Sequence, residues 1–274
     1  MGTGFVELPH DGRSIRLEYA WVGHDDAAPL LIFLHEGLGS LAMWRDWPQR
    51  LCEAGGYRGL VYSRYGYGQS TPRPADERWP PQFMHVQAAE TLPRLLAALG
   101  VDAERDPPWL FGHSDGGSIA LIHATLHPRA VAGVIAVAPH IMVEAVSIAS
   151  IERARDAYRT TELPARLARY HADPDSAFWG WNDVWLSAEF RDWSIEAMLA
   201  RLRCPVLAIQ GLDDEYGTLA QVHGIRTRAP HAEVVELANC GHSPHRDAPE
   251  ALLRVVIAFI RRHAMAVHNE GGDA

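Results

Sequence analysis

The chain has 274 residues, of which 47% are hydrophobic and 22% are charged, and this composition is that of an ordinary globular protein with a substantial core. Its 25 basic and 34 acidic residues leave a net charge of −9, without a long run of lysine and arginine. This balance argues against nucleic acid as a partner.

The first half of the chain alternates between strand and helix patterns. Residues 5–8 and 15–22 alternate apolar with polar side chains around His10-Asp11-Gly12-Arg13, which predicts a β-hairpin. Unalternated apolar runs, typical of strands covered on both faces, occur at 30–34, 59–63, 109–111 and 131–138. Helical spacing lies between these runs, around residues 43–51, at 87–99 and at 119–127. The rhythm predicts an α/β fold with a mainly parallel central sheet and helices on both faces.

The strand rhythm breaks after Pro139 and returns at Cys204. Between them, residues 140–200 contain helical stretches and many aromatic side chains. Two further strands, at 206–210 and 233–237, precede a closing helix at about 249–263. We therefore assign the core to residues 1–139 and 201–265. Residues 140–200 are predicted to be a helical cap inserted before the last two strands, and residues 266–274 a disordered tail.

The pentapeptide Gly112-His113-Ser114-Asp115-Gly116 matches G-x-S-x-G and joins a predicted strand to a predicted helix. A serine at such a turn has a strained backbone, and glycines two residues away on either side remove side chains that would collide there. Centring the turn on Asp115 would put His113 where glycine is needed, so Ser114 is the better nucleophile. Its hydroxyl would lie near the free N–H groups at a helix N-terminus, which can stabilise an oxyanion.

A serine nucleophile needs a base, and the base needs a carboxylate to hold its tautomer. Asp213 and Asp214 follow the strand at 206–210, whereas His242 and His245 follow the last strand. The carboxyl ends of parallel strands share one edge of a sheet, so we expect these side chains to meet Ser114. The residues alone leave either aspartate as the acid and either histidine as the base.

With these motifs in the order Ser…Asp…His, the chain resembles the α/β-hydrolase fold family over nearly its whole length. The resemblance includes His35-Glu36-Gly37 and Tyr65-Gly66-Tyr67-Gly68-Gln69-Ser70. It implies that Asp214 is the acid and His242 the base. It also implies that the amides of Asp115 and Gly37 form the oxyanion hole, with Glu36 in place of the family's usual glycine. Glu36 either points into the site and binds substrate or is an ordinary surface or hydrogen-bonded carboxylate.

The resemblance also implies that residues 140–200 form the cap that covers the active site. Trp179, Trp181 and Trp185 then predict an apolar substrate pocket, suited to a small aromatic or medium-chain acyl group. His245 is expected on the rim of this pocket, in contact with substrate or solvent.

The favoured function is hydrolysis of a small-molecule carboxylic ester, thioester or lactone through an acyl-enzyme on Ser114, without a cofactor. One alternative is a C–C bond hydrolase of vinylogous ketones. Some such enzymes carry a Cys-Gly-His turn like Cys240-Gly241-His242, but a methionine commonly follows their nucleophile where this chain has Asp115. The other alternative, a non-catalytic binding protein of the same fold, is disfavoured because Ser114, Asp214 and His242 are all present.

The remaining features indicate the surroundings in which the protein works. Cys52, Cys204 and Cys240 are widely spaced, which is typical of a reduced compartment, and the histidines show no metal-ligand spacing. No signal-peptide pattern is visible, and the longest apolar run is too short to span a bilayer. We expect a cytoplasmic monomer or homodimer that binds no metal and no membrane.

Overall fold

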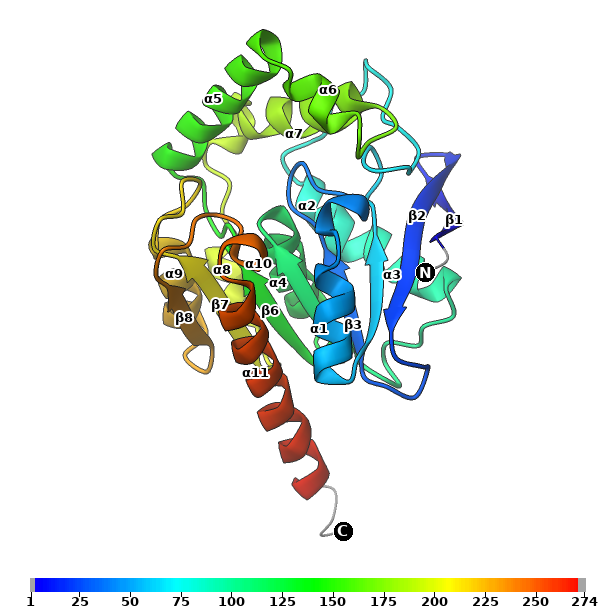
Figure 1. Cartoon of the computed structure of the whole chain (residues 1–274), viewed down its shortest axis with the longest axis vertical. Helices are drawn as coiled ribbons and strands as arrows, with labels where there is room; N and C mark the ends of the chain where they lie inside the picture. Colours follow the sequence, from blue (N-terminus) through cyan, green and yellow to red (C-terminus); the bar gives the residue numbers. More distant parts are fainter. Residues whose placement is uncertain (1–2, 271–274) are drawn as a thin grey trace.

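The computed structural model describes the backbone of residues 3–270 and the side chains of residues 3–264 (Figure 1). An eight-stranded sheet runs through the centre in the order β1-β2-β4-β3-β5-β6-β7-β8. The strands are β1 Thr3–His10, β2 Arg13–Gly23, β3 Leu30–Leu34, β4 Arg58–Tyr62, β5 Trp109–His113, β6 Gly133–Val137, β7 Val206–Gly211 and β8 Glu233–Leu237. Strand β2 pairs antiparallel with β1 and with β4, and the other neighbouring strands pair in parallel. The predicted mainly parallel sheet is confirmed.

The hairpin predicted at the start of the chain joins β1 to β2. Asp11 and Gly12 occupy its two turn positions with φ values of 45° and 75°. Positive φ at both central residues matches a turn whose twist suits antiparallel strands, which explains the Asp-Gly pair. The hairpin extends the parallel sheet at one edge, beside β4.

Helices cover both faces of the sheet. On one face lie α1 (Trp47–Gly55) and α11 (Pro249–Glu270), in front of the sheet in Figure 1. On the other face lie α2 (Phe83–Val86), the π-helical turn η2 (Gln87–Thr91), α3 (Leu92–Ala98), α4 (Asp115–Leu126) and α9 (Ala220–Arg228). A hydrophobic core lies on each face of the sheet, and alternate residues of β3 enter different cores. Phe33 packs in the core beneath α1 and α11, whereas Ile32 packs in the core beneath α4. Every residue of β3 is buried, as the unalternated run predicted.

The predicted insertion is helical. It contains α5 (Ala145–Thr160), α6 (Leu163–Leu167), α7 (Pro174–Trp185), η3 (Ala188–Phe190) and α8 (Glu196–Leu199). In Figure 1, α5, α6 and α7 lie together above the sheet and its carboxyl-end loops. Helix α8 instead contacts α4 and α9 of the core. An isolated bridge between Met142 and Ser194 closes the base of the insertion.

The ends of the chain differ in part from the prediction. Helix α11 continues to Glu270, so residues 266–270, expected in a disordered tail, are helical. Residues 271–274 lie outside the described residues. Within the part of the chain that is described, no helix is both long and apolar enough to cross a membrane. The two short helices not yet named, η1 (Ala42–Trp44) and α10 (Pro244–Asp247), flank the site described next.

Candidate active site

Ser114 lies in the sharp turn between β5 and α4. Its φ of 52° and ψ of −120° are unusual for a residue with a side chain, and such a conformation costs on the order of 1–3 kcal/mol. A Cβ added to Gly112 would lie 2.2 Å from the carbonyl oxygen of Gly116, and one added to Gly116 would lie 1.9 Å from that of Leu34. Only glycine permits this approach, so the two glycines bring α4 against β3 and present Ser114 at the sheet edge.

Ser114, His242 and Asp214 form one hydrogen-bonded line although 128 residues separate the first two. Oγ of Ser114 lies 2.9 Å from Nε2 of His242. Nδ1 of His242 lies 2.8 and 3.0 Å from the two carboxylate oxygens of Asp214. Since a carboxylate only accepts, Nδ1 carries the imidazole proton and Nε2 is free to accept the proton of the hydroxyl.

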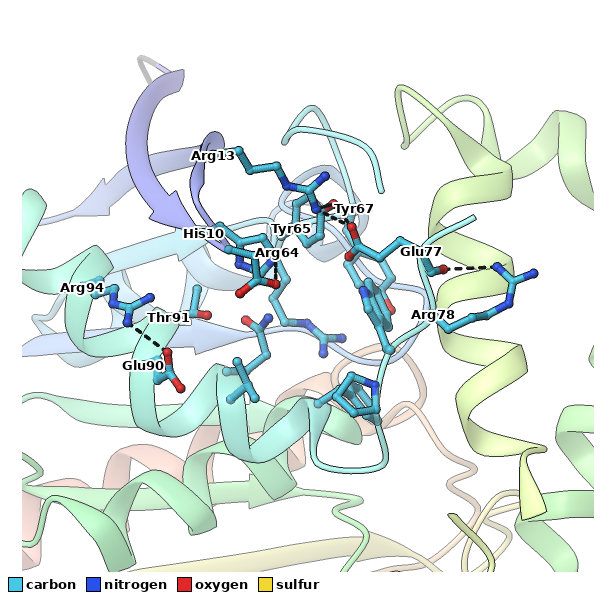
Figure 2. Close-up of a pocket in the computed structure, with 16 residues that line it drawn as sticks. His10, Arg13, Arg64, Tyr65, Tyr67, Glu77, Arg78, Glu90, Thr91 and Arg94 are labelled. Carbon is cyan, nitrogen blue, oxygen red and sulfur yellow. Dashed lines mark hydrogen bonds and ion pairs between the residues drawn. The ribbon is translucent and has the colours of Figure 1, made fainter. Parts of the chain in front are cut away.

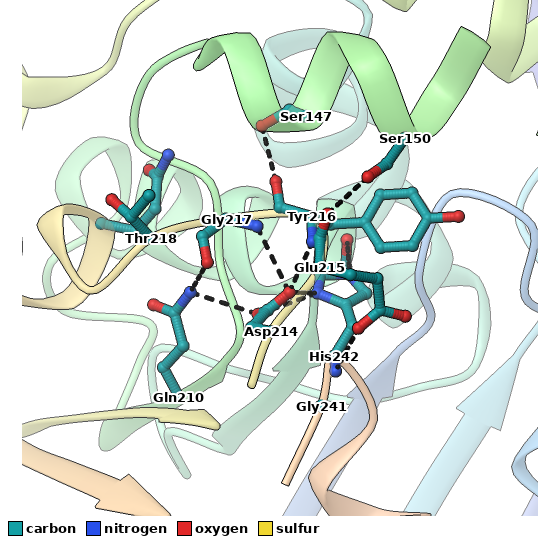
Figure 3. A network of polar contacts seen from close by, with 12 residues as sticks. Ser147, Ser150, Gln210, Asp214, Glu215, Tyr216, Gly217, Thr218, Gly241 and His242 are labelled. Atoms are coloured by element: carbon teal, nitrogen blue, oxygen red, sulfur yellow. Dashed lines mark hydrogen bonds and ion pairs between the residues drawn. The ribbon is translucent and has the colours of Figure 1, made fainter. Parts of the chain in front are cut away.

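Strand β7 and the loop after it hold Asp214 by hydrogen bonds to both carboxylate oxygens (Figure 3). Oδ1 accepts from the amides of Tyr216 at 2.8 Å and Gly217 at 3.2 Å, and Oδ2 accepts from Nε2 of Gln210 at 3.1 Å. Burial opposes ionisation, but the hydrogen bond and charge of His242 and the Tyr216 amide outweigh it and lower the pKa of Asp214. Asp213 is exposed, so of the two aspartates only Asp214 reaches His242.

The same loop is fastened to the cap helix α5, as Figure 3 shows. Oγ of Ser147 donates to the carbonyl of Tyr216 at 2.6 Å, and Oγ of Ser150 donates to the carbonyl of Glu215. The Glu215 carboxylate in turn accepts from the amide of His242 at 3.2 Å. Helix α5 is therefore connected to the loop that carries Asp214 and, through Glu215, to the backbone of His242.

The loop after β3 turns the amide of Gly37 toward the site. The carbonyl of Glu36 accepts from Nη2 of Arg64 at 2.8 Å and from Nδ1 of His35 at 2.7 Å. Since C=O and N–H of a trans peptide point in opposite directions, the Gly37 amide faces away from Arg64. That amide has no acceptor among the described residues. The amide of Asp115 opens α4, where N–H groups lack intrahelical acceptors, so both predicted oxyanion donors are available.

The side chains of Glu36 and Asp115 are held in different ways. The Glu36 carboxylate lies 3.5 Å from Nδ1 of His113 and is 19% exposed. Burial opposes its charge, but the proximity of His113, with His245 and His35 nearby, holds the pKa of Glu36 well below its ordinary range. Asp115 is fully buried and accepts from Nε1 of Trp185 at 3.2 Å. Burial raises the pKa of Asp115, and Arg64 partly offsets that effect.

A cavity of about 140 Å³ opens above Ser114, and we name it the Ser114 cavity. Trp181, Trp185 and Ile151 line it from the cap. Its core-side wall consists of Glu36, Gly37, Leu38, His113, Asp115, His140, Tyr216, His242 and Ser243. A Cβ on Gly37 would lie 2.2 Å from Nε1 of Trp181, so this indole rests directly on the loop after β3.

Two residues predicted to bind substrate lie outside the Ser114 cavity. Trp179 packs on the ring of Tyr158 and under the guanidinium of Arg159 instead. Two residues span about 200° around a helix, so Trp179 faces away from Trp181, whereas Trp185 lies one turn further on the same face. His245 is only 7% exposed and is packed among Trp44, Trp47 and His113, which corrects its expected place on the rim.

Six residues of the cavity wall were not predicted from the sequence: Leu38, His113, His140, Ile151, Tyr216 and Ser243. His140 and Tyr216 follow β6 and the acid position, so their place after the carboxyl ends of strands was a usable signal. Ile151 lies on α5, and nothing in its local sequence indicates which face of that helix is covered. The described residues contain no group of three or more potential metal-ligating side chains, and the three cysteines are buried and free.

The chain is similar to known proteins in both sequence and fold. The model of a protein family described as the alpha/beta hydrolase family matches residues 31–255. The chain is 26% identical to a proline iminopeptidase of Levilactobacillus brevis, over 92% of this chain and 95% of that protein. A thermophilic esterase from Thermogutta terrifontis superposes with a TM-score of 0.72 at 19% identity, covering 96% of this chain and 99% of that one. A meta-cleavage product hydrolase from Pseudomonas fluorescens superposes with a TM-score of 0.71 at 17% identity, covering 90% of this chain and 95% of that one. At these identities the structural likeness shows the fold, and the site must decide the chemistry.

The placement of the two aspartates leads to a first prediction. Asp214→Asn should lower turnover by about ten-thousandfold, because an amide favours the wrong tautomer of His242. Asp213→Asn is the matched control and should leave turnover within about twofold of wild type, because its side chain is exposed and His242 Nδ1 pairs with Asp214 instead. Steady-state kinetics with one activated ester tests both variants. Equal losses would contradict the assignment of Asp214.

A second prediction follows from the buried histidines. Burial above all, then the neighbouring His113, lowers the pKa of His245 to about 3, whereas an unfolded histidine has a pKa of about 6.5. Between these values the unfolded chain binds the extra proton, so stability falls as the pH falls, by about 1.4 kcal/mol per pH unit for this residue. His245→Phe should therefore flatten the dependence of the free energy of unfolding on pH below about 6.5.

Urea unfolding of both proteins across this range measures the effect. The comparison at about pH 8, where the wild-type side chain is neutral in both states, isolates the change in packing. Parallel pH profiles for the two proteins would show that His245 does not titrate on unfolding.

Proposed function

The chain belongs to the alpha/beta hydrolase family, and we propose that within it this protein is a serine hydrolase that cleaves a small carboxylic ester without a cofactor. The observation that carries the proposal is the hydrogen-bonded line from Ser114 through His242 to Asp214, next to two free amides. A nucleophile, an oriented base and an oxyanion site within one cavity are what acyl transfer requires.

In the first half of the reaction, Oγ of Ser114 attacks the ester carbonyl carbon and its proton passes to Nε2 of His242. The carbonyl electron pair moves to oxygen, and the amides of Gly37 and Asp115 stabilise the resulting oxyanion. Collapse of this intermediate breaks the ester C–O bond, and His242 returns the proton to the departing alcohol. Asp214 stabilises the imidazolium throughout without taking its proton.

In the second half, a water molecule replaces the alcohol. His242 accepts a proton from this water as it attacks the acyl-enzyme, and the same amides bind the second oxyanion. Collapse releases the carboxylic acid and returns the proton from His242 to Ser114. Atoms and charge balance with water as the sole co-reactant.

The size of the Ser114 cavity limits the part of the substrate that it encloses to a compact group. A cavity of about 150 Å³ is enough for one benzene molecule, and this cavity measures about 140 Å³. Trp181, Trp185 and Ile151 make its cap side apolar. We therefore propose a substrate whose acyl group is a single ring or a short chain, thioesters and lactones of that size included.

The ionised carboxylate of Glu36 favours one further candidate. Because it forms part of the cavity wall, it would attract a cationic amine, and the relative from Levilactobacillus brevis is an iminopeptidase. Cleavage of an amide next to a free amine is therefore the second candidate function. The ester remains preferred because His113 already pairs with Glu36, which reduces its attraction for a ligand.

The C–C bond hydrolase considered from the sequence is a weaker candidate. The residue after the nucleophile is Asp115, whose side chain is used to bind the cap through Trp185. Enzymes of that class commonly have a methionine at this position, whereas this chain has a carboxylate.

Labelling and a substrate panel test the proposed function. The wild type should react with a fluorophosphonate and hydrolyse p-nitrophenyl acetate and benzoate, whereas Ser114→Ala should lose the label and about a millionfold in turnover. Circular dichroism would verify that the variant is folded. A prolyl amide with a free amine and a vinylogous ketone complete the panel. A higher kcat/KM for either of these than for every ester would transfer the assignment to that class, and a folded Ser114→Ala variant with a tenth of wild-type turnover would refute the nucleophile.

The two faces of α7 give a prediction about acyl preference. Trp181→Ala should enlarge the cavity and shift the ratio of kcat/KM for large against small acyl esters by about tenfold, equivalent to about 1.4 kcal/mol. Trp179→Ala removes the same side chain from the opposite face and should leave that ratio unchanged. Because the ratio cancels a general loss of activity, it reports the pocket itself. An equal shift of this ratio in both variants would mean that α7 affects acyl preference through the stability of the cap and not by lining the cavity.

A further inference from the structure

A second cavity, of about 550 Å³, lies between the β1–β2 hairpin, the loop after β4 and the helical segment α2–η2, and we name it the hairpin cavity. Figure 2 shows Arg13, Tyr65 and Glu77 at one side of it and Glu90, Thr91 and Arg94 at another. Its volume lies within the range of small-molecule sites and exceeds the 140 Å³ of the Ser114 cavity. None of the residues that line it belongs to the Ser114 cavity.

The hairpin cavity contains a buried positive charge. Arg64 is 1% exposed; its Nε lies 3.4 Å from Nε2 of His35, and its Nη2 donates to the carbonyl of Glu36. The Asp115 carboxylate lies 3.8 Å from Nη2, too far for a hydrogen bond. Nη1 donates to no described residue, although Arg64 lines the cavity. The Nη1 group of the guanidinium therefore remains free to donate to a carboxylate, whose geometry matches that of the planar guanidinium.

Tyr67 adds a second donor beside Arg64. The guanidinium carbon of Arg64 lies 4.8 Å from the centre of the Tyr67 ring. The Tyr67 hydroxyl is buried and has no hydrogen-bond partner in the described part of the chain. Buried hydroxyls nearly always have a partner, and because Tyr67 lines the hairpin cavity, a molecule bound there can supply it. Gln87 Oε1, at the start of the π-helical turn, is a second unpartnered polar atom in the wall.

The walls and the rim limit what can bind. Trp79 and Phe83 stack with ring centres 5.8 Å apart and give the cavity an apolar aromatic wall. At the rim Arg13 binds Glu77, Arg94 binds Glu90 at 2.9 Å, and the exposed Arg78 lies 3.8 Å from Asp183 outside the cavity. Arg64 is the buried cation of the cavity, and its guanidinium lies beside the aromatic ring of Tyr67.

We propose that the hairpin cavity is a binding site for a small organic monocarboxylate with an aromatic or short apolar body. The carboxylate accepts from Nη1 of Arg64 and the hydroxyl of Tyr67, and the body lies against Trp79 and Phe83. A charged acceptor receives shorter and stronger hydrogen bonds than a neutral one, so the charge is the recognised feature. Inorganic phosphate lacks the apolar body and would leave the aromatic wall unused.

Calorimetric titration of the intact protein with benzoate tests this site. Benzoate should bind with a millimolar or tighter Kd, and benzyl alcohol, which has the same ring without the charge, should bind at least about tenfold more weakly. Tyr67→Phe should weaken benzoate binding by about five- to tenfold, because it removes one donor and keeps the ring. Tyr67 does not line the Ser114 cavity, so this variant separates the two sites.

Tyr62→Phe is the matched control. Tyr62 is also a buried tyrosine with an unpartnered hydroxyl, but it lines neither cavity, so its variant should bind benzoate like the wild type. Equal weakening in both tyrosine variants, equal binding of benzoate and benzyl alcohol, or no benzoate binding would overturn the proposal. Tighter binding of phosphate than of benzoate would overturn the assignment of a carboxylate with an apolar body.

Discussion

The close approach of α4 to β3 is the constraint on which the rest of this structure depends. A carbonyl oxygen of β3 occupies the space where any side chain at position 116 would lie, so glycine is required there. The approach forces Ser114 into its positive-φ conformation and directs its hydroxyl away from the sheet. It also puts the first amide of α4 next to that hydroxyl. The proposed nucleophile and one proposed oxyanion donor thus arise from one packing contact, and the strain of the turn is balanced by the burial around it.

The cap is more than a cover over this turn. Ser147 and Ser150 of α5 bind carbonyls of the loop that carries Asp214, and Trp185 of α7 binds the side chain of Asp115. The helices that set the size of the Ser114 cavity thereby also position the acid and the start of α4. In the proposed reaction, a change at these contacts is therefore expected to affect both substrate preference and turnover.

Buried charge on the core side of the site is arranged around Arg64. Its guanidinium binds the carbonyl of Glu36 and so orients the Gly37 amide, while its charge partly compensates Asp115 behind the nucleophile. Isolated buried charges are costly, and the described structure places each of these near an opposite charge or a hydrogen-bond partner. Glu36 fits this arrangement: His113 holds its carboxylate, and Arg64 and His35 hold its carbonyl. The loop can therefore accept glutamate in place of the family's usual glycine.

The sequence by itself determined the sheet, the serine turn and the order of the three aligned residues, because these depend on local patterns. Apolar runs mark buried strands, glycines mark the tight turn, and parallel strand ends share an edge. The residue pattern alone left Asp213 and Asp214 as alternatives, and the family resemblance favoured Asp214. The tertiary structure then showed that Asp214 contacts His242 and that Asp213 is exposed. It likewise placed Trp179 and His245 away from the Ser114 cavity. Which face of a helix or loop meets a cavity depends on partners remote in sequence, and no local pattern records them.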